Sequence, residues 1–160
     1  MMNQLNNWFS NVSAYAEMSP DLTMRLQINQ WLHAHRRDLS AAAWCRRFAA
    51  HSDNAELLSF VYQQFSEYSG LSVGCVRPED TLHGDLHFAL VCWHDWVITF
   101  CEDFMEQFEL DLSDCFDEDD FETVGEMMTF LSAQLATVQE TPDSTSVPHL
   151  TALPSVAIAS

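Results

Sequence analysis

Four residues of the types that bind metals lie close together in the chain: His83, His87, Cys92 and His94. Imidazole and thiolate groups are the usual zinc ligands, and two histidines four residues apart lie on one face of a helix. The spacing matches no standard zinc motif, however, and the stretch spans the expected junction of a loop and a helix. We therefore interpret these side chains as capping or packing groups rather than as a metal site.

The carboxylates of residues 111–122 (DLSDCFDEDDFE) suggest calcium binding or hydrolytic chemistry. A calcium-binding EF-hand loop needs glycine at its sixth position, and Phe116 stands there. The chain also lacks a supported Ser-His-Asp or Cys-His signature and a glycine-rich phosphate loop. We expect no catalytic residue, no metal and no other cofactor, and hence a protein that is not an enzyme.

The charge of the protein is unevenly distributed. The net charge is -18, with six arginines and no lysine against twenty-four acidic residues. Residues 1–77 are neutral in sum, whereas residues 78–143 contain eighteen acidic residues and no basic one. Such a chain does not bind nucleic acid through its phosphates, since that affinity comes from Lys and Arg, and an anionic membrane surface is disfavoured as well.

Carboxylates without neighbouring basic groups repel one another and destabilise a folded protein. The acidic half of the chain has two interpretations. Charged runs are often only solvated surface, but a field of this size also steers a basic partner. We favour docking of a protein with a basic surface. The carboxylates predicted to make the contact belong to one helix and one loop: Asp95, Glu102, Asp103 and Glu106, and Asp117, Glu118, Asp119 and Asp120.

Five of the six arginines lie within residues 25–47. They are too few to overcome the acidic charge for nucleic-acid binding. We expect them to pair with the acidic half of the same chain or with that of a second copy, which makes a homodimer possible.

Composition indicates a single folded unit. Hydrophobic residues make up 48%, with eleven Phe and five Trp, which is more apolar mass than a disordered acidic chain carries. The five cysteines are odd in number and contain no Cys-x-x-Cys, as expected for reduced thiols. With neither a signal peptide nor an apolar run of the ~20 residues that a membrane span needs, we predict a cytoplasmic protein.

The elements that must position these groups are predicted to be helices, because residues 21–77 and 79–141 contain no proline. The sequence predicts an all-α fold of six helices and a tail. Apolar stripes or capping signals predict three helices in the first part of the chain: around Leu5 to Ala16, from Ser19-Pro20 to His35, and from a Ser40 cap to His51. Three more are predicted after them: from an Asp53/Glu56 capping box to Tyr68, over residues 93–108, and from a Thr123/Glu126 capping box to Val138.

The predicted inward faces follow helical spacing, and Gly70 and Gly74 should interrupt the chain. Four helices carry the expected core: Met24, Ile28, Trp31, Leu32 and His35; Leu57, Val61, Phe65 and Tyr68; Trp93, Trp96, Val97, Phe100, Phe104 and Phe108; and Val124, Met127, Met128, Leu131, Leu135 and Val138.

Three motifs occur in the order found in acyl carrier proteins. They are a loop, VRPEDTLHGDL (76–86), the end of an acidic helix, EQFELDL (106–112), and the start of a last helix, TVGE (123–126). Residues 55–135 therefore resemble an acyl carrier domain. A divergent bacterial carrier-like family of unknown function, which has the Asp-Thr-x-Leu loop and no modifiable serine, is more similar still. The resemblance implies a four-helix domain whose acidic helix docks on basic partners.

One departure from the carrier pattern determines the expected chemistry. Carriers bear phosphopantetheine on a serine at the start of the acidic helix, and counting along the motifs places that position at His94 or Leu90. No serine lies between Ser72 and Ser113, so we predict that no prosthetic group is attached.

These considerations predict a non-enzymatic, carrier-like protein-binding module in three parts: a helical extension (1–52), an acidic carrier-like domain (53–140) and a flexible tail (141–160). Two other functions remain open. An acidic secretion-type chaperone or adaptor would be a dimer with an exposed apolar surface for a client. A DNA mimic would align its carboxylates over a long flat face and inhibit a nucleic-acid-binding protein.

Overall fold

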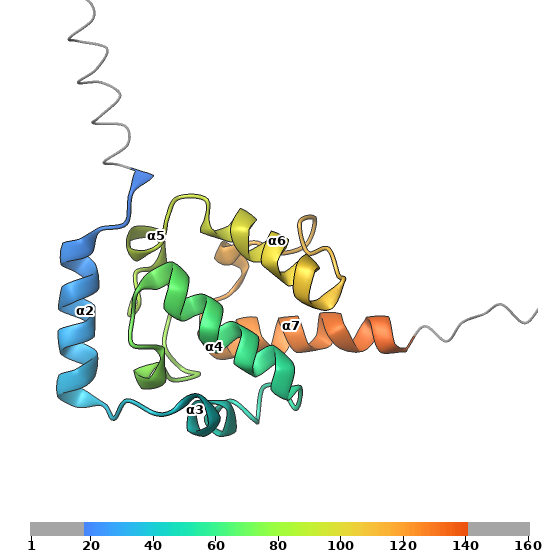
Figure 1. The fold of residues 1–160 in the computed structure, drawn as a ribbon, viewed down its shortest axis with the longest axis horizontal. Helices are drawn as coiled ribbons and strands as arrows, with labels where there is room; N and C mark the ends of the chain where they lie inside the picture. Colours follow the sequence, from blue (N-terminus) through green and yellow to red (C-terminus); the bar gives the residue numbers. More distant parts are fainter. Residues whose placement is uncertain (1–17, 141–160) are drawn as a thin grey trace, which may run out of the picture.

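The computed structural model describes residues 18–140, and these residues are all-helical, as predicted (Figure 1). The predicted helix around residues 5–16 and the predicted tail lie outside the described residues. The described part contains six α-helices, two 3-10 turns and no β-strand: α2 (Leu22–His35), α3 (Ala41–Arg47), α4 (Ala55–Ser69), η1 (Val73–Cys75), α5 (Phe88–Val91), α6 (Trp96–Phe108), η2 (Glu118–Asp120) and α7 (Val124–Gln139). None of these helices is long and apolar enough to cross a bilayer.

The start of α2 differs from the Ser19-Pro20 start predicted by the sequence. Asp21 is the N-cap, and its carboxylate accepts a hydrogen bond from the Met24 amide at 2.9 Å. The Asp21 amide in turn donates to the carbonyl of Leu90 at 2.8 Å. This long-range bond fixes Asp21 at the helix entrance, and the helix begins later than a local capping signal indicates.

Ser40 caps α3 as predicted, whereas the Asp53/Glu56 capping box is wrong. Asn54 caps α4, with its side chain accepting from the Leu57 amide at 3.0 Å. Buried Ser52 explains the shift, because its hydroxyl accepts from the Asn54 amide at 3.1 Å and donates to Ser132 of α7 at 3.0 Å.

The two predicted glycine breaks have different causes. Gly70 ends α4 in the left-handed conformation, at φ 63°, where residues with a Cβ are strained. Gly74 lies in η1, and a Cβ there would come within 2.1 Å of the Asp38 carboxylate and 2.3 Å of the Leu39 carbonyl. Gly74 therefore allows the segment between α2 and α3 to pass directly over η1.

The predicted helix over residues 93–108 is shorter in the structure. The chain forms the brief helix α5, turns, and enters α6 only at Trp96, so Trp93 lies outside the helix and is 54% exposed. The Trp96 amide donates to the carbonyl of Trp93 at 3.0 Å in this turn. Trp96, Phe100 and Phe104 are buried as predicted.

The Thr123/Glu126 capping box at the start of α7 is confirmed, with both reciprocal hydrogen bonds present. The predicted inward face of α7 is buried as far as Leu135, but Val138 is exposed near the end of the helix. Trp31 and His35, which were predicted on the inward face of α2, are exposed, and their rings stack at 4.9 Å. His51, which was predicted to belong to the third helix, lies beyond the end of α3.

Aromatic side chains form the centre of the protein. Helix α4 crosses the middle of the molecule, with α6 on one side and α7 behind it (Figure 1). Phe60 of α4 packs edge-on against Phe104 and Phe108 of α6, at ring-centroid distances of 5.7 and 5.3 Å. Phe116 continues the cluster between Phe100, at 4.9 Å, and Phe130 of α7, at 6.3 Å. The acidic helix thus has a rigid aromatic backing.

A buried ion pair joins the neutral half to the acidic half. Arg36, which follows α2, donates to both carboxylate oxygens of Asp80, at 2.5 and 2.8 Å, and the Arg77 amide donates to the same group at 2.8 Å. This hydrogen bonding raises the pKa of Arg36. The Asp80 carbonyl also accepts from the Val124 amide at the start of α7, at 3.0 Å. For Arg36, the expected pairing with the chain's own acidic half is confirmed.

We expect Asp80→Asn to lower the free energy of unfolding by about 3 kcal/mol, because it leaves the half-buried Arg36 cation without its counter-charge. Urea denaturation followed by circular dichroism measures the change. The neighbouring exposed Glu79 provides the control, and Glu79→Gln should change stability by less than about 0.5 kcal/mol. Equal losses in the two variants would contradict a special role for the pair.

Candidate functional site

The outer face of α6 carries three of the predicted docking carboxylates. Asp95 at the N-cap, Glu102 and Glu106 are all exposed, and spacings of seven and four residues place them on one side of a helix. The opposite side holds buried Trp96, Phe100 and Phe104. The predicted division of this helix into an apolar and an acidic face is therefore confirmed from residue 96 onward.

Asp103, the fourth predicted helix carboxylate, faces a different direction. It is half-buried and accepts a hydrogen bond from the phenol of Tyr68 on α4. Burial, together with this carboxylate, raises the pKa of Tyr68 well above its usual value. Asp103 thus connects α6 to α4 and is not part of the outward acidic face.

Glu118, in η2, is also held by the protein itself. Its Oε2 accepts a hydrogen bond from the indole Nε1 of Trp96 at 3.0 Å. Burial raises the pKa of Glu118, and the indole bond partly opposes this shift. The contact joins the acidic loop to the first residue of α6.

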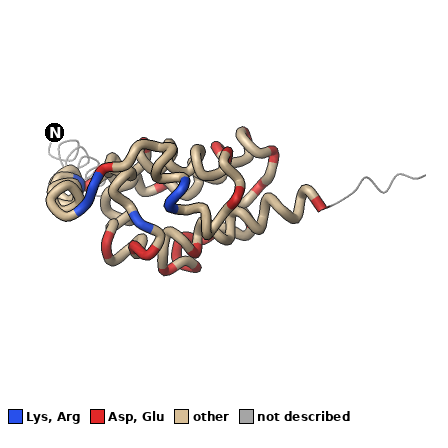
Figure 2. The backbone as a smooth tube through the Cα atoms, turned by 90° about the horizontal axis from the view of Figure 1, so that it is seen from below, with Lys and Arg blue, Asp and Glu red and all other residues tan. Residues whose placement is uncertain are grey.

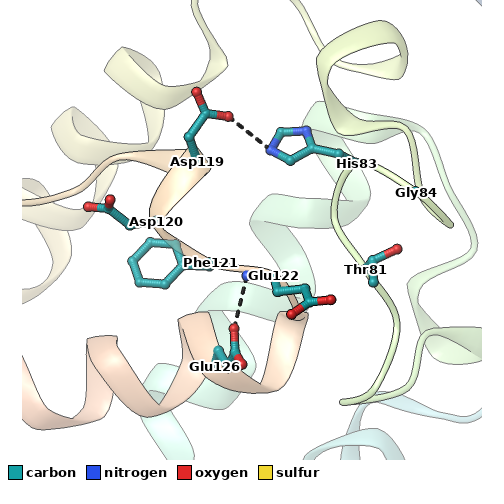
Figure 3. A pocket seen from close by; sticks show the side chains of 8 residues that line it. All are labelled: Thr81, His83, Gly84, Asp119, Asp120, Phe121, Glu122 and Glu126. Carbon is teal, nitrogen blue, oxygen red and sulfur yellow. Dashed lines mark hydrogen bonds and ion pairs between the residues drawn. The ribbon is translucent and has the colours of Figure 1, made fainter.

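Two of the other loop carboxylates, Asp119 and Asp120, line a surface pocket of about 610 Å³ between η2 and the loop before α5 (Figure 3). Asp117 stabilises the loop by accepting from the Asp119 amide at 3.0 Å. In Figure 3 the side chains of Asp119 and His83 point toward one another, and Asp119 Oδ1 lies 3.3 Å from His83 Nε2. The lining residues are Thr81, His83, Gly84, Asp119, Asp120, Phe121, Glu122 and Glu126.

The lining of this pocket contains four carboxylates and one imidazole, so its net charge is negative. Glu126 also accepts from the Glu122 amide at 2.9 Å, as drawn in Figure 3. The Thr81 hydroxyl donates to the Asp85 carboxylate at 2.9 Å and accepts from the Asp85 amide at 2.8 Å. Hydrogen bonds from Thr81 lower the pKa of Asp85, the largest effect coming from the main-chain amide. The pocket can attract cationic groups through its field.

The four metal-type residues do not converge on one point. His83 pairs with Asp119, while His87 precedes α5 in a left-handed conformation, at φ 51°. Burial raises the pKa of Cys92 to about 12, which keeps it a thiol, and His94 is exposed. Within residues 18–140 no three His, Cys, Asp or Glu side chains are placed to hold a metal ion.

The structure therefore brings Asp119 and Asp120 together with residues that sequence analysis did not assign to a partner site. Glu122 and Glu126 were visible as part of the acidic run and the capping box, and His83 as a metal-type residue. Ile98 and Met105 were missed as surface residues on α6. Their exposure could have been predicted from the sequence, because Ile98 and Met105 fall among the acidic positions of the helix rather than on its apolar stripe.

Acidic and basic residues are mixed in residues 18–77, whereas residues 78–140 carry acidic residues only (Figure 2). The basic residues are Arg25 in α2, Arg36 and Arg37 after it, Arg46 and Arg47 in α3, and Arg77 after η1. Comparison with family models, with curated proteins and with solved structures finds no match to this chain.

We expect Glu118→Gln to increase the free energy of unfolding slightly at pH 7. Glutamine keeps an acceptor for Trp96 but carries no charge to bury. Because the pKa of Glu118 is raised on folding, the wild-type protein gains stability as the pH falls through that value. The advantage of the variant should therefore shrink toward acidic pH in urea titrations. An advantage that is independent of pH would contradict this assignment, and exposed Glu122→Gln is the matched control.

Proposed function

We propose that this protein is a non-enzymatic, acyl-carrier-like binding module that docks a basic protein partner through α6 and the acidic loop (residues 114–122). The observation that carries the proposal is the outward carboxylate face of Asp95, Glu102 and Glu106, beside a loop of further carboxylates, in a half of the chain without Lys or Arg. These groups have no internal counter-charge in residues 78–140, so a basic partner would relieve their mutual repulsion.

The carrier-like part of the proposal is supported by the placement of the three motifs. The 76–86 loop is anchored by Asp80, residues 106–112 end α6, and Thr123 caps α7. Residues 53–140 contain α4, α5, α6 and α7. The order of elements is compatible with a carrier-like domain to which α2 and α3 are added.

The proposal includes the absence of a prosthetic group. The two positions that correspond to the carrier serine are Leu90, in α5, and His94, in the turn before α6. Neither side chain can form the phosphodiester. Co-expression with a broad-specificity phosphopantetheinyl transferase should leave the intact mass equal to the sequence mass, and a gain of about 340 Da would contradict the proposal.

A secretion-type chaperone or adaptor is the second candidate, and an exposed apolar patch favours it. Hydrogen bonds from Asp21 to Leu90 and from His94 to Met18, at 2.8 and 3.3 Å, bring the start of α2 next to α5. The segments that meet at this junction carry the exposed apolar side chains Met18, Leu22, Leu26, Leu90 and Trp93, which we take as the patch. A client that binds there would be captured through apolar contacts, without the acidic face of α6.

Charge reversal on α6 tests the docking proposal. We expect the double variant Glu102→Lys, Glu106→Lys to reduce capture of basic proteins from a cell lysate at least about tenfold, because it places like charges against the partner. Quantitative affinity purification with mass spectrometry measures the loss.

The matched control changes the net charge equally on another surface. Asp53→Lys with Glu67→Lys alters two exposed residues before and within α4 and should leave capture nearly unchanged. Equal capture by all three proteins would contradict docking through α6. Equal loss in both variants would show that only net charge matters, and would contradict it as well. Capture that instead depends on Leu22 and Trp93 would favour the chaperone candidate.

A further inference from the structure

The acidic face of α6 also contains two large exposed apolar side chains. Ile98 is 63% exposed and Met105 is 48% exposed, and their seven-residue spacing aligns them along the helix. Glu102 lies between them, four residues after Ile98 and three before Met105. Ile98 and Met105 therefore add apolar surface to the outward acidic face of α6.

A hollow of about 220 Å³ lies beside Ile98 and Glu102, between α6 and the start of the acidic loop. It is lined by Val97, Ile98, Cys101, Glu102, Ser113 and Phe116. Phe116 is fixed by its stack on Phe100, at a centroid distance of 4.9 Å. Burial raises the pKa of Cys101, so this part of the lining is a neutral thiol. The hollow therefore has a preformed and mainly apolar floor.

Carboxylates surround the hollow on both sides. Glu102 belongs to its lining, and Glu106 follows one turn later on the exposed side of α6. On the loop side, a second hollow shares Ser113 and Phe116 with the first and adds Asp114, Asp117 and Asp120. No Lys or Arg occurs in residues 78–140. The combined surface is an apolar strip with an acidic border.

We infer that this hollow receives an apolar side chain from a basic amphipathic helix of the partner, and that Ile98 and Met105 contact the apolar face of that helix. The inference rests on the proposed docking function and specifies the partner's chemistry. Helices bind grooves through apolar residues spaced at i, i+3 or i+4, and i+7, while Lys or Arg beside them would meet the carboxylates. A second copy that docks through this same face is disfavoured as the occupant, because both surfaces would be acidic.

Two synthetic 18-residue peptides test the inference. One carries leucine on one helical face and lysine elsewhere, and the other carries alanine in place of each leucine. Fluorescence anisotropy measures the dissociation constants for the wild type and for Ile98→Ser, Met105→Ser. We expect this variant to bind the leucine peptide about tenfold more weakly or worse, and the alanine peptide as the wild type does.

The control is Leu22→Ser, Leu26→Ser, which removes two equally large side chains, 70% and 58% exposed, from α2. It should leave the dissociation constant of the leucine peptide unchanged. All four mutated residues are exposed, so circular dichroism should report unchanged folding.

The outcomes separate this inference from the docking proposal. If Glu102→Lys, Glu106→Lys weakens binding of both peptides but the serine variant at positions 98 and 105 does not, the apolar inference is overturned and acidic docking stands. Equal loss in the α2 control also overturns it. If neither peptide binds the wild-type protein, both the inference and docking of basic helices by α6 are overturned.

Discussion

The buried pair between Arg36 and Asp80 is the contact on which the relation of the two halves depends. One carboxylate receives two guanidinium hydrogen bonds and the Arg77 amide, and its own main chain receives the first amide of α7. Three chain segments therefore meet at Asp80, which is 3% exposed: the end of α2, the 77–80 loop and the start of α7. Desolvating one carboxylate this deeply is tolerable only because Arg36 is supplied by the neutral half. The loop that follows is thereby held where His83 meets Asp119.

The remaining carboxylates fall into two groups with different consequences. Asp103 and Glu118 are bound to the aromatic residues Tyr68 and Trp96, and they attach α6 to its neighbours. Asp95, Glu102 and Glu106 point outward instead. The rigid aromatic core behind α6 keeps these outward charges close together despite their repulsion, and such a preorganised field favours a basic ligand at little reorganisation cost.

Sequence reasoning was reliable where the determining interactions are local. The Ser40 cap, the capping box of Thr123 and the apolar face of α6 all follow from residues within one or two helical turns. It was wrong where distant contacts intervene. Leu90 fixes the entrance of α2 and Ser132 that of α4, so both helices start after the predicted residues. The inward attachment of Asp103 and Glu118 involves partners 35 and 22 residues away, which no helical periodicity encodes.

Hydrogen–deuterium exchange of the full chain, free and saturated with the basic amphipathic leucine peptide, tests the central claim most directly. Docking on the acidic face predicts slower exchange in residues 96–108 and 114–122, with α2 and α3 unchanged. Slower exchange at the junction of α2 and α5, with α6 unaffected, would contradict the account. It would identify the apolar patch as the binding surface instead.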